Sequence, residues 1–337
     1  RLKRFKPFQR STMNFGILGS GSWGTALALL LARAGVSVRL WDRSPDQVER
    51  LQEHRENRQY LAGCPLPETI EIVADLTAAI DNVDGIVFAV PAGALSQMTT
   101  QVVKLLNGNL GSHIGPVAVI VSKGIKVECL LLPSAVMERA GWNGRSVVLS
   151  GPNLATEVAQ DIPAAAVAAC HDVDTAAAVQ RWFCTERFRV YASTDCIGVE
   201  VGGAVKNVLA VAAGISDGLS FGDNTKAALL TRGLVEMARL GVAMGASKDT
   251  FYGLSGVGDL LATAGSRLSR NWRVGYALAQ GMPLTDAVAS IGQVAEGVES
   301  SKALRNLSKQ LGVEMPVCDA VFAVCYENVH PREAVAR

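Results

Sequence analysis

Residues 14–42 have the sequence NFGILGSGSWGTALALLLARAGVSVRLWD, which predicts a strand, a glycine-rich turn, a helix and a second strand. The turn has the pattern G-x-G-x-x-G, formed by Gly19, Gly21 and Gly24. In this pattern one glycine turns the chain, one lets the backbone approach a pyrophosphate, and one lets helix and strand pack closely. A glycine-rich turn without a ligand is the alternative, but the strand–turn–helix order favours dinucleotide binding.

The residues at the end of the second predicted strand bear on the choice of dinucleotide. Asp42 can accept hydrogen bonds from the adenosine ribose hydroxyls, which favours NAD. Arg43 beside it can pair with the additional phosphate of NADP. Either side chain could also be an ordinary solvated charge. The sequence therefore predicts NAD or NADP and does not decide between them.

The rest of the first half alternates short β-rich runs with longer helical patterns, which is typical of a mostly parallel sheet covered by helices. The interior runs are continuously hydrophobic, as expected for strands buried on both faces. The predicted strands are residues 15–18, 36–41, 70–73, 86–90, 117–121, 147–149, 165–169 and 188–191.

After about residue 195 the pattern is helical, with Gly-rich connections and no convincing strand. The predicted helices are residues 199–217, 225–244, 284–291, 299–311 and 317–326. We therefore predict an α/β Rossmann-like N-terminal domain with a mostly parallel sheet over 13–195, followed by an all-α domain over 196–337. Residues 1–12 are predicted to be a basic, disordered arm.

Composition restricts the classes of function. With 337 residues the chain is long enough for about two domains, and 49% hydrophobic residues can form packed cores. Five of the 32 Lys+Arg lie in the arm, which leaves 27 against 31 Asp+Glu, or −4, for the remainder. This balance argues against a nucleic-acid binder. The seven cysteines form no C-x-x-C pair and the four histidines lack ligand spacing, so we expect reduced thiols in a cytoplasm and no metal. No uninterrupted apolar run is long enough to span a membrane.

A lysine in an apolar helix is the first candidate for chemistry. Residues 199–215 are almost wholly apolar, yet they contain Lys206. Its side chain leans toward Gly203 and Gly202, which we expect to leave space for a ligand. Burial would lower its pKa into a useful acid–base range. The alternative is a lysine whose ammonium reaches the surface over the helix.

Three further groups of polar residues are candidates. Asp259 and Thr263 would share a helix face if a helix begins near Gly258, although Asp259 could simply start that helix. The segment 266–271 is dense in donors suited to a phosphate, or is a solvated basic turn. Lys123 closes the fifth predicted strand, at the edge where ligands of a parallel sheet gather.

Seven short blocks, taken together and in order, resemble NAD(P)-dependent glycerol-3-phosphate dehydrogenase of the bacterial type. The resemblance runs from Asn14 to about residue 335, so the basic arm lies outside it. The blocks are residues 19–26, 122–124, 150–152, 202–207, 256–260, 269–271 and 294–297.

The resemblance implies reversible hydride transfer between the nicotinamide and C2 of dihydroxyacetone phosphate or sn-glycerol 3-phosphate. It makes Lys206 the general acid and base, with Asp259 orienting or polarising it and Lys123 near the same oxygen. Asn207 and Thr263 would lie around these three charged side chains. It also implies a supply of glycerol 3-phosphate for glycerophospholipid synthesis, a cytoplasmic location and a homodimer.

The resemblance further implies two sets of binding residues. Asn153 stands where this family more often has Ser or Thr. The expected substrate contacts are Lys123, Gly151, Asn153, Lys206, Asp259, Ser269, Arg270 and Asn271. The expected cofactor contacts, besides the three glycines and Asp42, are Ser22, Trp23, Arg43, Lys123, Ala155, Arg270, Val294 and Glu296.

Two rival functions are compatible with parts of the pattern. A dehydrogenase of β-hydroxy acids could use Arg270 to hold a carboxylate. A non-catalytic nucleotide-binding sensor could keep the fold, although it would not need a proton donor such as Lys206.

Overall fold

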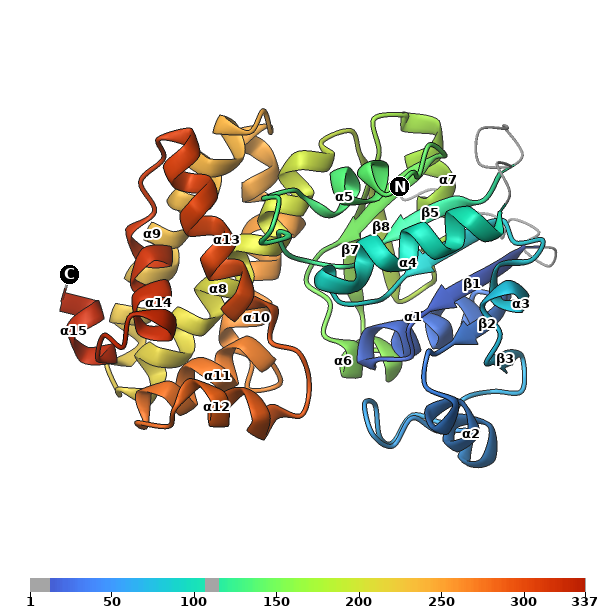
Figure 1. The fold of residues 1–337 in the computed structure, drawn as a ribbon, viewed down its shortest axis with the longest axis horizontal. Coiled ribbons are helices and arrows are strands. Elements are labelled where there is room, and N and C mark those ends of the chain that lie inside the picture. Colours follow the sequence, from blue (N-terminus) through green and yellow to red (C-terminus); the bar gives the residue numbers. More distant parts are fainter. Residues whose placement is uncertain (1–12, 107–114, 337) are drawn as a thin grey trace.

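The computed structural model describes residues 13–106 and 115–336, with a sheet and its helices on one side and a helical half on the other (Figure 1). The predicted disordered arm, residues 1–12, lies outside the described residues. The described strands form one sheet of eight, in the order β3-β2-β1-β4-β5-β6-β7-β8. They are β1 Asn14–Leu18, β2 Ser37–Trp41, β3 Ile70–Val73, β4 Gly85–Phe88, β5 Val117–Ile120, β6 Ser146–Ser150, β7 Ala164–Ala169 and β8 Phe188–Ser193.

The sheet is parallel except where β6 meets β7. Both the predicted strands and the mostly parallel fold class are therefore confirmed, with strand ends shifted by no more than two residues. The central strand β1 lies between β2 and β4, so the direction of chain progression reverses beside it. Ligands of open α/β sheets bind at such a reversal, beyond the carboxyl ends of the strands.

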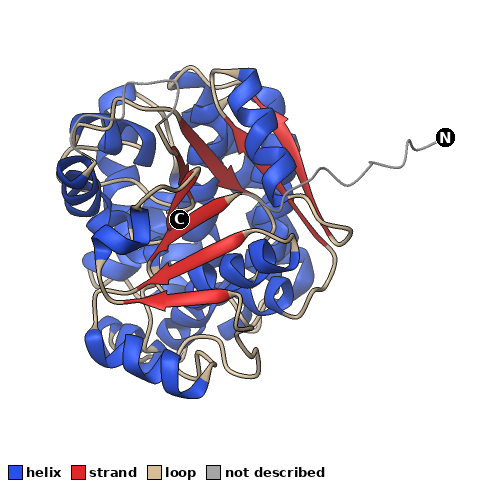
Figure 2. Ribbon diagram, turned by 90° about the vertical axis from the view of Figure 1, so that its right-hand side faces the viewer, coloured by secondary structure: helices blue, strands red, loops and turns tan. Residues whose placement is uncertain are grey.

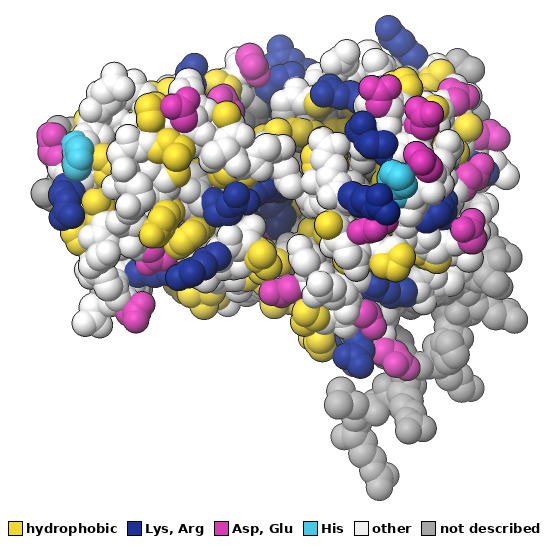
Figure 3. Space-filling view, turned by 90° about the horizontal axis from the view of Figure 1, so that it is seen from below, with side chains coloured by type: hydrophobic (Ala, Val, Ile, Leu, Met, Phe, Trp, Pro, Cys, Tyr) yellow, Lys and Arg dark blue, Asp and Glu magenta, His cyan; other side chains and the backbone are white. Residues whose placement is uncertain are grey.

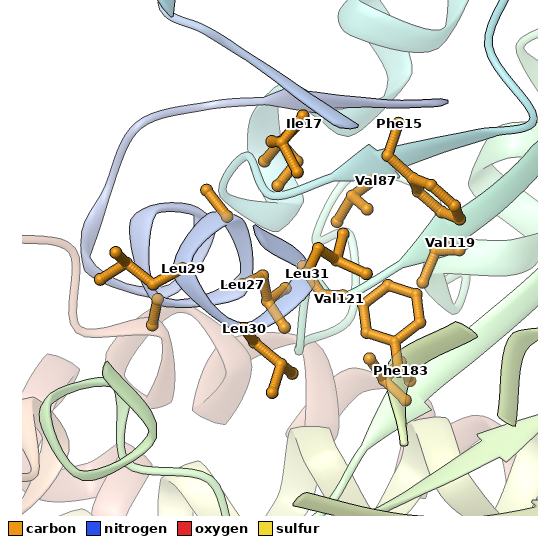
Figure 4. Close-up of a cluster of buried hydrophobic side chains, with 14 of the residues drawn as sticks. Phe15, Ile17, Leu27, Leu29, Leu30, Leu31, Val87, Val119, Val121 and Phe183 are labelled. Carbon is orange, nitrogen blue, oxygen red and sulfur yellow. The ribbon is translucent and has the colours of Figure 1, made fainter. Parts of the chain in front are cut away.

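Helices cover both faces of the sheet (Figure 2). Successive strand residues alternate between the two faces, so Phe15 and Ile17 join one hydrophobic cluster while Leu18 joins the other. Figure 4 shows part of the first cluster, in which Phe15 meets Phe183 edge to face, with ring centres 5.8 Å apart. The first cluster includes residues of α1 Ser22–Arg33, α2 Pro45–His54, α6 Ala155–Ala159 and α7 Val173–Phe183; the second includes residues of α3 Leu76–Ile80, α4 Ala92–Leu105 and α5 Pro133–Arg139.

The helical half is built around α8, Cys196–Gly218, against which α9, α10, α11, α13 and α14 pack. By length and hydropathy α8 could cross a membrane, but 94% of its most apolar window is buried in the structure, as in a core helix. The described residues after Ser193 contain no strand, as predicted. The helices are α9 Gly222–Ala243, α10 Asp259–Gly265, α11 Arg270–Ala279, α12 Leu284–Ile291, α13 Glu296–Leu311, α14 Pro316–Tyr326 and α15 Pro331–Ala336.

The five helices expected in this half are present, with ends that differ by up to three residues. Helices α11 and α15 were not predicted. A 3-10 helix, Lys248–Tyr252, and a π-helical turn, Leu254–Gly258, precede α10. The last strand ends at Ser193 and α8 begins at Cys196, while the division into domains at residue 195 remains a prediction.

Candidate active site

Three charged side chains from distant segments meet between the two halves. Lys206 Nζ lies 2.8 Å from Asp259 Oδ1, and Lys123 Nζ lies 2.6 Å from Asp259 Oδ2. Lys206 Nζ also donates a hydrogen bond of 2.7 Å to Thr263 Oγ1. The Asp259 side chain is 1% exposed and the Lys206 side chain 8%, so this cluster is almost fully removed from water.

Each member is positioned by a different element. Lys123 follows β5, at the carboxyl edge of the sheet, and also donates to the carbonyl oxygen of Gly151 at 3.2 Å. Lys206 lies in the middle of α8. Asp259 is the first residue of α10, so the interpretation of it as a helix-starting carboxylate is correct, but it is also a buried partner of both lysines.

The two glycines beside Lys206 do not leave an open space, which corrects the expectation from the sequence. A Cβ on Gly202 would clash with the carbonyl oxygen of Ser255, in the π-helical turn. A Cβ on Gly203 would lie 3.4 Å from Cγ of Lys123. Gly202 therefore allows the turn before Asp259 to approach α8, while the space beside Gly203 is bounded at ordinary contact distance by the stem of Lys123. Lys206 also does not reach the surface, because its ammonium is held by Asp259 and Thr263.

The charges in the cluster shift one another's pKa. Burial lowers the pKa of Lys206 to about 8; Asp259 opposes this shift and Lys123 adds to it. Burial acts to raise the pKa of Asp259, but the two lysines more than offset that effect and hold it below its ordinary value. At neutral pH the cluster therefore contains an ionised carboxylate and a Lys206 ammonium that can release its proton.

The segment 266–271 contains the start of α11, and its side chains have different surroundings. Arg270 is exposed, whereas Ser269 is buried and its hydroxyl caps the helix by accepting from the Trp272 amide. Asn271 is buried and donates to Asn207 Oδ1 at 2.9 Å, while its own Oδ1 accepts from the Gly297 amide at 2.9 Å. The interpretation as a wholly solvated basic turn is therefore wrong.

The glycine-rich turn has room for a pyrophosphate. Gly19 has a φ of +110°, and α1 begins at Ser22 without a side-chain cap. A Cβ placed on Gly21 would meet nothing within 4 Å, whereas one on Gly24 would clash with the Gly19 carbonyl. An open glycine beside an uncapped helix N-terminus, with a second glycine that permits close packing, fits a dinucleotide.

Asp42, which is expected to accept hydrogen bonds from the ribose, already accepts hydrogen bonds from other residues of the chain. Asp42 Oδ2 accepts from the Ser20 amide at 3.0 Å and from Ser20 Oγ at 2.6 Å, and Oδ1 accepts from the Ser44 amide at 3.0 Å. Each carboxylate oxygen has more than one acceptor position, so these bonds fix the orientation of Asp42 and leave it able to accept further.

The remaining expected cofactor contacts lie on both halves. Glu296 begins α13, and its partly buried side chain accepts through Oε1 from the Ala92 amide at 3.3 Å across the two halves. Ser22 Oγ lies 2.8 Å from the Tyr60 carbonyl oxygen and 3.1 Å from Gln293 Oε1. The other expected contacts, all at least partly exposed, are Trp23, Arg43, Ala155 and Val294.

Some polar groups near the cluster lack a protein partner. Asn153 donates through Nδ2 to the Ala165 carbonyl at 2.9 Å, but its buried Oδ1 has no hydrogen-bond partner among the described residues. The same holds for the hydroxyl of Ser150, which would lie 3.4 Å from a Cβ on Gly203, beside Lys123. Sequence reasoning gave Ser150 and Gln293 no role; the only signal was their position within or beside the motif blocks.

The surface of the molecule is hollowed between the two halves. In the space-filling view, basic side chains line a hollow between the two halves (Figure 3). Within the described residues, no group of three or more His, Cys, Asp or Glu side chains is arranged to hold a metal ion. The arrangement combines the buried ammonium of Lys206, a second ammonium on Lys123 and the exposed guanidinium of Arg270, with the glycine-rich turn on the adjoining sheet.

Two family models match the chain, described as NAD-dependent glycerol-3-phosphate dehydrogenase N-terminus, over residues 14–176, and C-terminus, over residues 195–336. The chain is 46% identical to a glycerol-3-phosphate dehydrogenase [NAD(P)+] of Geobacillus thermodenitrificans, covering 96% of this chain and 93% of the relative. It is also 46% identical to the protein of that name from Pelotomaculum thermopropionicum, over 95% and 90%. A crystal structure of glycerol-3-phosphate dehydrogenase from Coxiella burnetii has a TM-score of 0.91 and 38% identity, over 96% of this chain and 98% of that one.

Proposed function

The chain belongs to the NAD-dependent glycerol-3-phosphate dehydrogenase family, and we propose that it reversibly reduces dihydroxyacetone phosphate to sn-glycerol 3-phosphate, with Lys206 as general acid and base. The observation that carries the assignment of Lys206 is its burial against Asp259, Thr263 and a second ammonium, with a pKa of about 8. A group with such a pKa can both donate and accept a proton near neutral pH.

In the reducing direction, the substrate carbonyl at C2 gains a hydride on carbon and a proton on oxygen. The bound reduced nicotinamide supplies the hydride. Lys206 Nζ gives its proton to the oxygen as negative charge develops there, and the neutral amine then regains a proton from solvent. Lys123 stabilises the same negative charge, while Asp259 fixes both ammonium groups. In the oxidising direction, the neutral Lys206 amine accepts the proton of the C2 hydroxyl.

The substrate phosphate would bind at the start of α11. Arg270 is exposed there and carries a forked donor suited to phosphate oxygens. Ser269 and Asn271 have side-chain hydrogen bonds within the chain, so we propose that they mainly hold the start of α11 in place around Arg270. From the sheet, Gly151 and Asn153 would contact the substrate, and the unpartnered Oδ1 of Asn153 supports this role.

The cofactor would lie over the carboxyl edge of the sheet. The three glycines and the N-terminus of α1 would hold the pyrophosphate, and Asp42 and Arg43 would face the adenosine ribose. At the nicotinamide end, the contacts would come from both halves of the molecule. The further proposed contacts are Ser22, Trp23, Lys123, Ala155, Arg270, Val294 and Glu296.

The family likeness supports three further proposals. The product would serve glycerophospholipid synthesis, the protein would act in the cytoplasm, and it would form a homodimer. Each can be tested on its own: by glycerolipid content after loss of the gene, by cell fractionation, and by the mass of the protein in solution.

Initial rates with NADH and with NADPH test the proposed activity. We expect oxidation of the reduced cofactor with dihydroxyacetone phosphate, and none with ketones derived from β-hydroxy acids. Turnover of such ketones without turnover of dihydroxyacetone phosphate would contradict the substrate assignment. Tight cofactor binding without any turnover would indicate a sensor instead.

A further inference from the structure

Helix α8 carries a second buried charged side chain besides Lys206. Glu200 is 4% exposed, and both of its carboxylate oxygens are used by one residue of the sheet half. Oε1 accepts from the Ser134 amide at 2.7 Å, and Oε2 accepts from Ser134 Oγ at 2.7 Å. Ser134 lies at the start of α5, so this pair joins the helix that carries Lys206 to the other half of the molecule.

The segment of chain that leads to Ser134 begins at Lys123. After Lys123 it leaves the sheet and packs on the helical half, where Ile125 and Leu132 belong to the same hydrophobic cluster as Val201 of α8. The intervening turn is closed by two backbone hydrogen bonds, from the amide of 126 to the carbonyl of 131 and from the amide of 130 to the carbonyl of 126. We call residues 123–134 the connecting segment. It is a compact unit with Lys123 at one end and Ser134 at the other.

A buried carboxylate such as that of Glu200 costs folding free energy at this position. Burial raises its pKa to about 7; the hydrogen bonds from Ser134 oppose the shift, and the carboxylate of Glu138 on α5 adds to it. Cys196, one turn earlier on α8, brings no positive charge. No ion-pair partner of Glu200 is found in the described parts of the chain. An apolar side chain would avoid this cost, so a contribution to stability explains Glu200 poorly.

We propose that Glu200 is a positioning residue, which holds Ser134 against α8 and thereby fixes the connecting segment so that the ammonium of Lys123 stays on Asp259 beside Lys206. The proposal rests on the proposed function, because it acts through Lys206 as the acid. The proposed role of Glu200 acts through its bonds to Ser134 and involves no contact with substrate or cofactor.

Loss of the Glu200–Ser134 pair has two expected effects. If Lys123 withdraws from Asp259, one cation is missing where negative charge develops, and kcat falls by about 10- to 100-fold. The pKa of Lys206 also rises, because Lys123 no longer lowers it and Asp259 pairs with Lys206 alone. The alkaline limb of the kcat profile for reduction therefore moves to higher pH.

Glu236 provides a matched control. It is also a buried glutamate on a long helix, α9, and it too receives two hydrogen bonds at the start of another helix, from the amides of Val317 at 2.8 Å and Cys318 at 3.2 Å. Burial raises its pKa as well. Both partners lie within the helical half, so its loss should destabilise the protein without moving the connecting segment.

The experiment measures kcat, KM for dihydroxyacetone phosphate and the pH profile of kcat for the full chain with Glu200→Ala, Glu200→Gln, Ser134→Ala, Glu236→Ala and Lys206→Met. Glu200→Ala is expected to lower kcat by about 10- to 100-fold, to change KM by less than about threefold and to shift the alkaline limb upward. Glu200→Gln should restore kcat, because an amide can accept from the Ser134 amide and donate to its hydroxyl. Glu236→Ala should leave both kcat and the limb unchanged.

Two results separate the two proposals. If Lys206→Met is inactive while Glu200→Ala has the kcat and pH profile of Glu236→Ala, the positioning role is wrong and the proposed function stands. If Lys206→Met keeps normal turnover, the reduction of dihydroxyacetone phosphate stands, the assignment of Lys206 as the acid fails, and the positioning role fails with that assignment. If Glu200→Ala does not fold, Ser134→Ala tests the positioning role instead. This variant removes the hydroxyl bond to Glu200 and keeps the amide bond. Ser134→Ala is expected to shift the alkaline limb of the kcat profile to higher pH by a smaller amount than Glu200→Ala. An alkaline limb that does not shift would overturn the proposal.

Discussion

Lys206 Nζ lies 2.8 Å from Asp259 Oδ1, although 53 positions separate the two residues in the chain. Lys123 Nζ lies 2.6 Å from the other oxygen of the same carboxylate. Asp259 thus holds two ammonium groups together in a site where the Lys206 side chain is 8% exposed. In the proposed function, this arrangement delivers a proton and stabilises negative charge at one substrate oxygen, and that proposal predicts how activity should depend on pH.

The two reaction directions should have opposite pH dependences. Burial lowers the pKa of Lys206 to about 8. Reduction needs the protonated ammonium, so its kcat should fall as pH rises through about 8; oxidation needs the neutral amine, so its kcat should rise over the same range. Initial rates from pH 6 to 10 in both directions measure this. Limbs that move in the same direction would exclude a single group as acid and base.

Replacement of Arg270 by Ala should weaken use of the phosphorylated substrate. Loss of a charge-assisted hydrogen bond to phosphate should lower kcat/KM for dihydroxyacetone phosphate by about 10- to 150-fold, mainly through KM. Dihydroxyacetone, which has no phosphate, is the matched control and should be used equally poorly by both proteins. An equal loss with both substrates would show that Arg270 acts elsewhere.

Replacement of Gly202 by Ala should disturb the site by moving the turn that precedes Asp259. The new Cβ would clash with the Ser255 carbonyl, and the π-helical turn that leads into Asp259 would have to move. We expect a loss of about 1–3 kcal/mol in the free energy of unfolding, together with a lower kcat. Gly265→Ala, at a glycine with open space around it, should change neither. Normal activity of Gly202→Ala would mean that this turn does not set the position of Asp259.

Stability should depend on pH through Glu200. Its pKa is raised in the folded state, from an ordinary 4.5 to about 7, so its contribution is fully present below pH 4.5 and is lost as pH rises toward 7. Glu200→Gln has no such loss. The free energy of unfolding of this variant, relative to the unmodified chain, should therefore increase by up to about 3 kcal/mol over that range. Urea titrations at several pH values measure the difference, and a constant difference would show that Glu200 does not titrate there.

The sequence predicted the strands of the sheet because short apolar runs alternate with longer helical patterns over residues 14–195. It also predicted that Lys206 and Asp259 belong to one site, through the family resemblance rather than through spacing. It did not predict α11, whose polar first turn and internal Gly275 weaken the helical pattern. In the structure that glycine lets α11 approach α8, since a Cβ there would clash with the Val211 carbonyl.

The surroundings of the site depended on contacts that spacing cannot show. Gly202 and Gly203 suggested an empty space, but a backbone turn and the stem of Lys123 fill it. Glu200 was visible only as one polar residue in an apolar helix, because its partner Ser134 lies 66 positions earlier in the chain. The local sequence pattern identifies a charged residue in an apolar helix as unusual, but only the fold shows which residue it contacts.

A single-turnover measurement with Lys206→Met tests most directly whether Lys206 is the proton donor. Enzyme in excess is mixed with reduced cofactor and dihydroxyacetone phosphate, and the loss of nicotinamide absorbance is followed, while cofactor affinity is measured separately. We predict unchanged cofactor affinity and hydride transfer slower by about 100- to 10,000-fold. Hydride transfer at the rate of the unmodified enzyme would contradict the role of Lys206 as the proton donor.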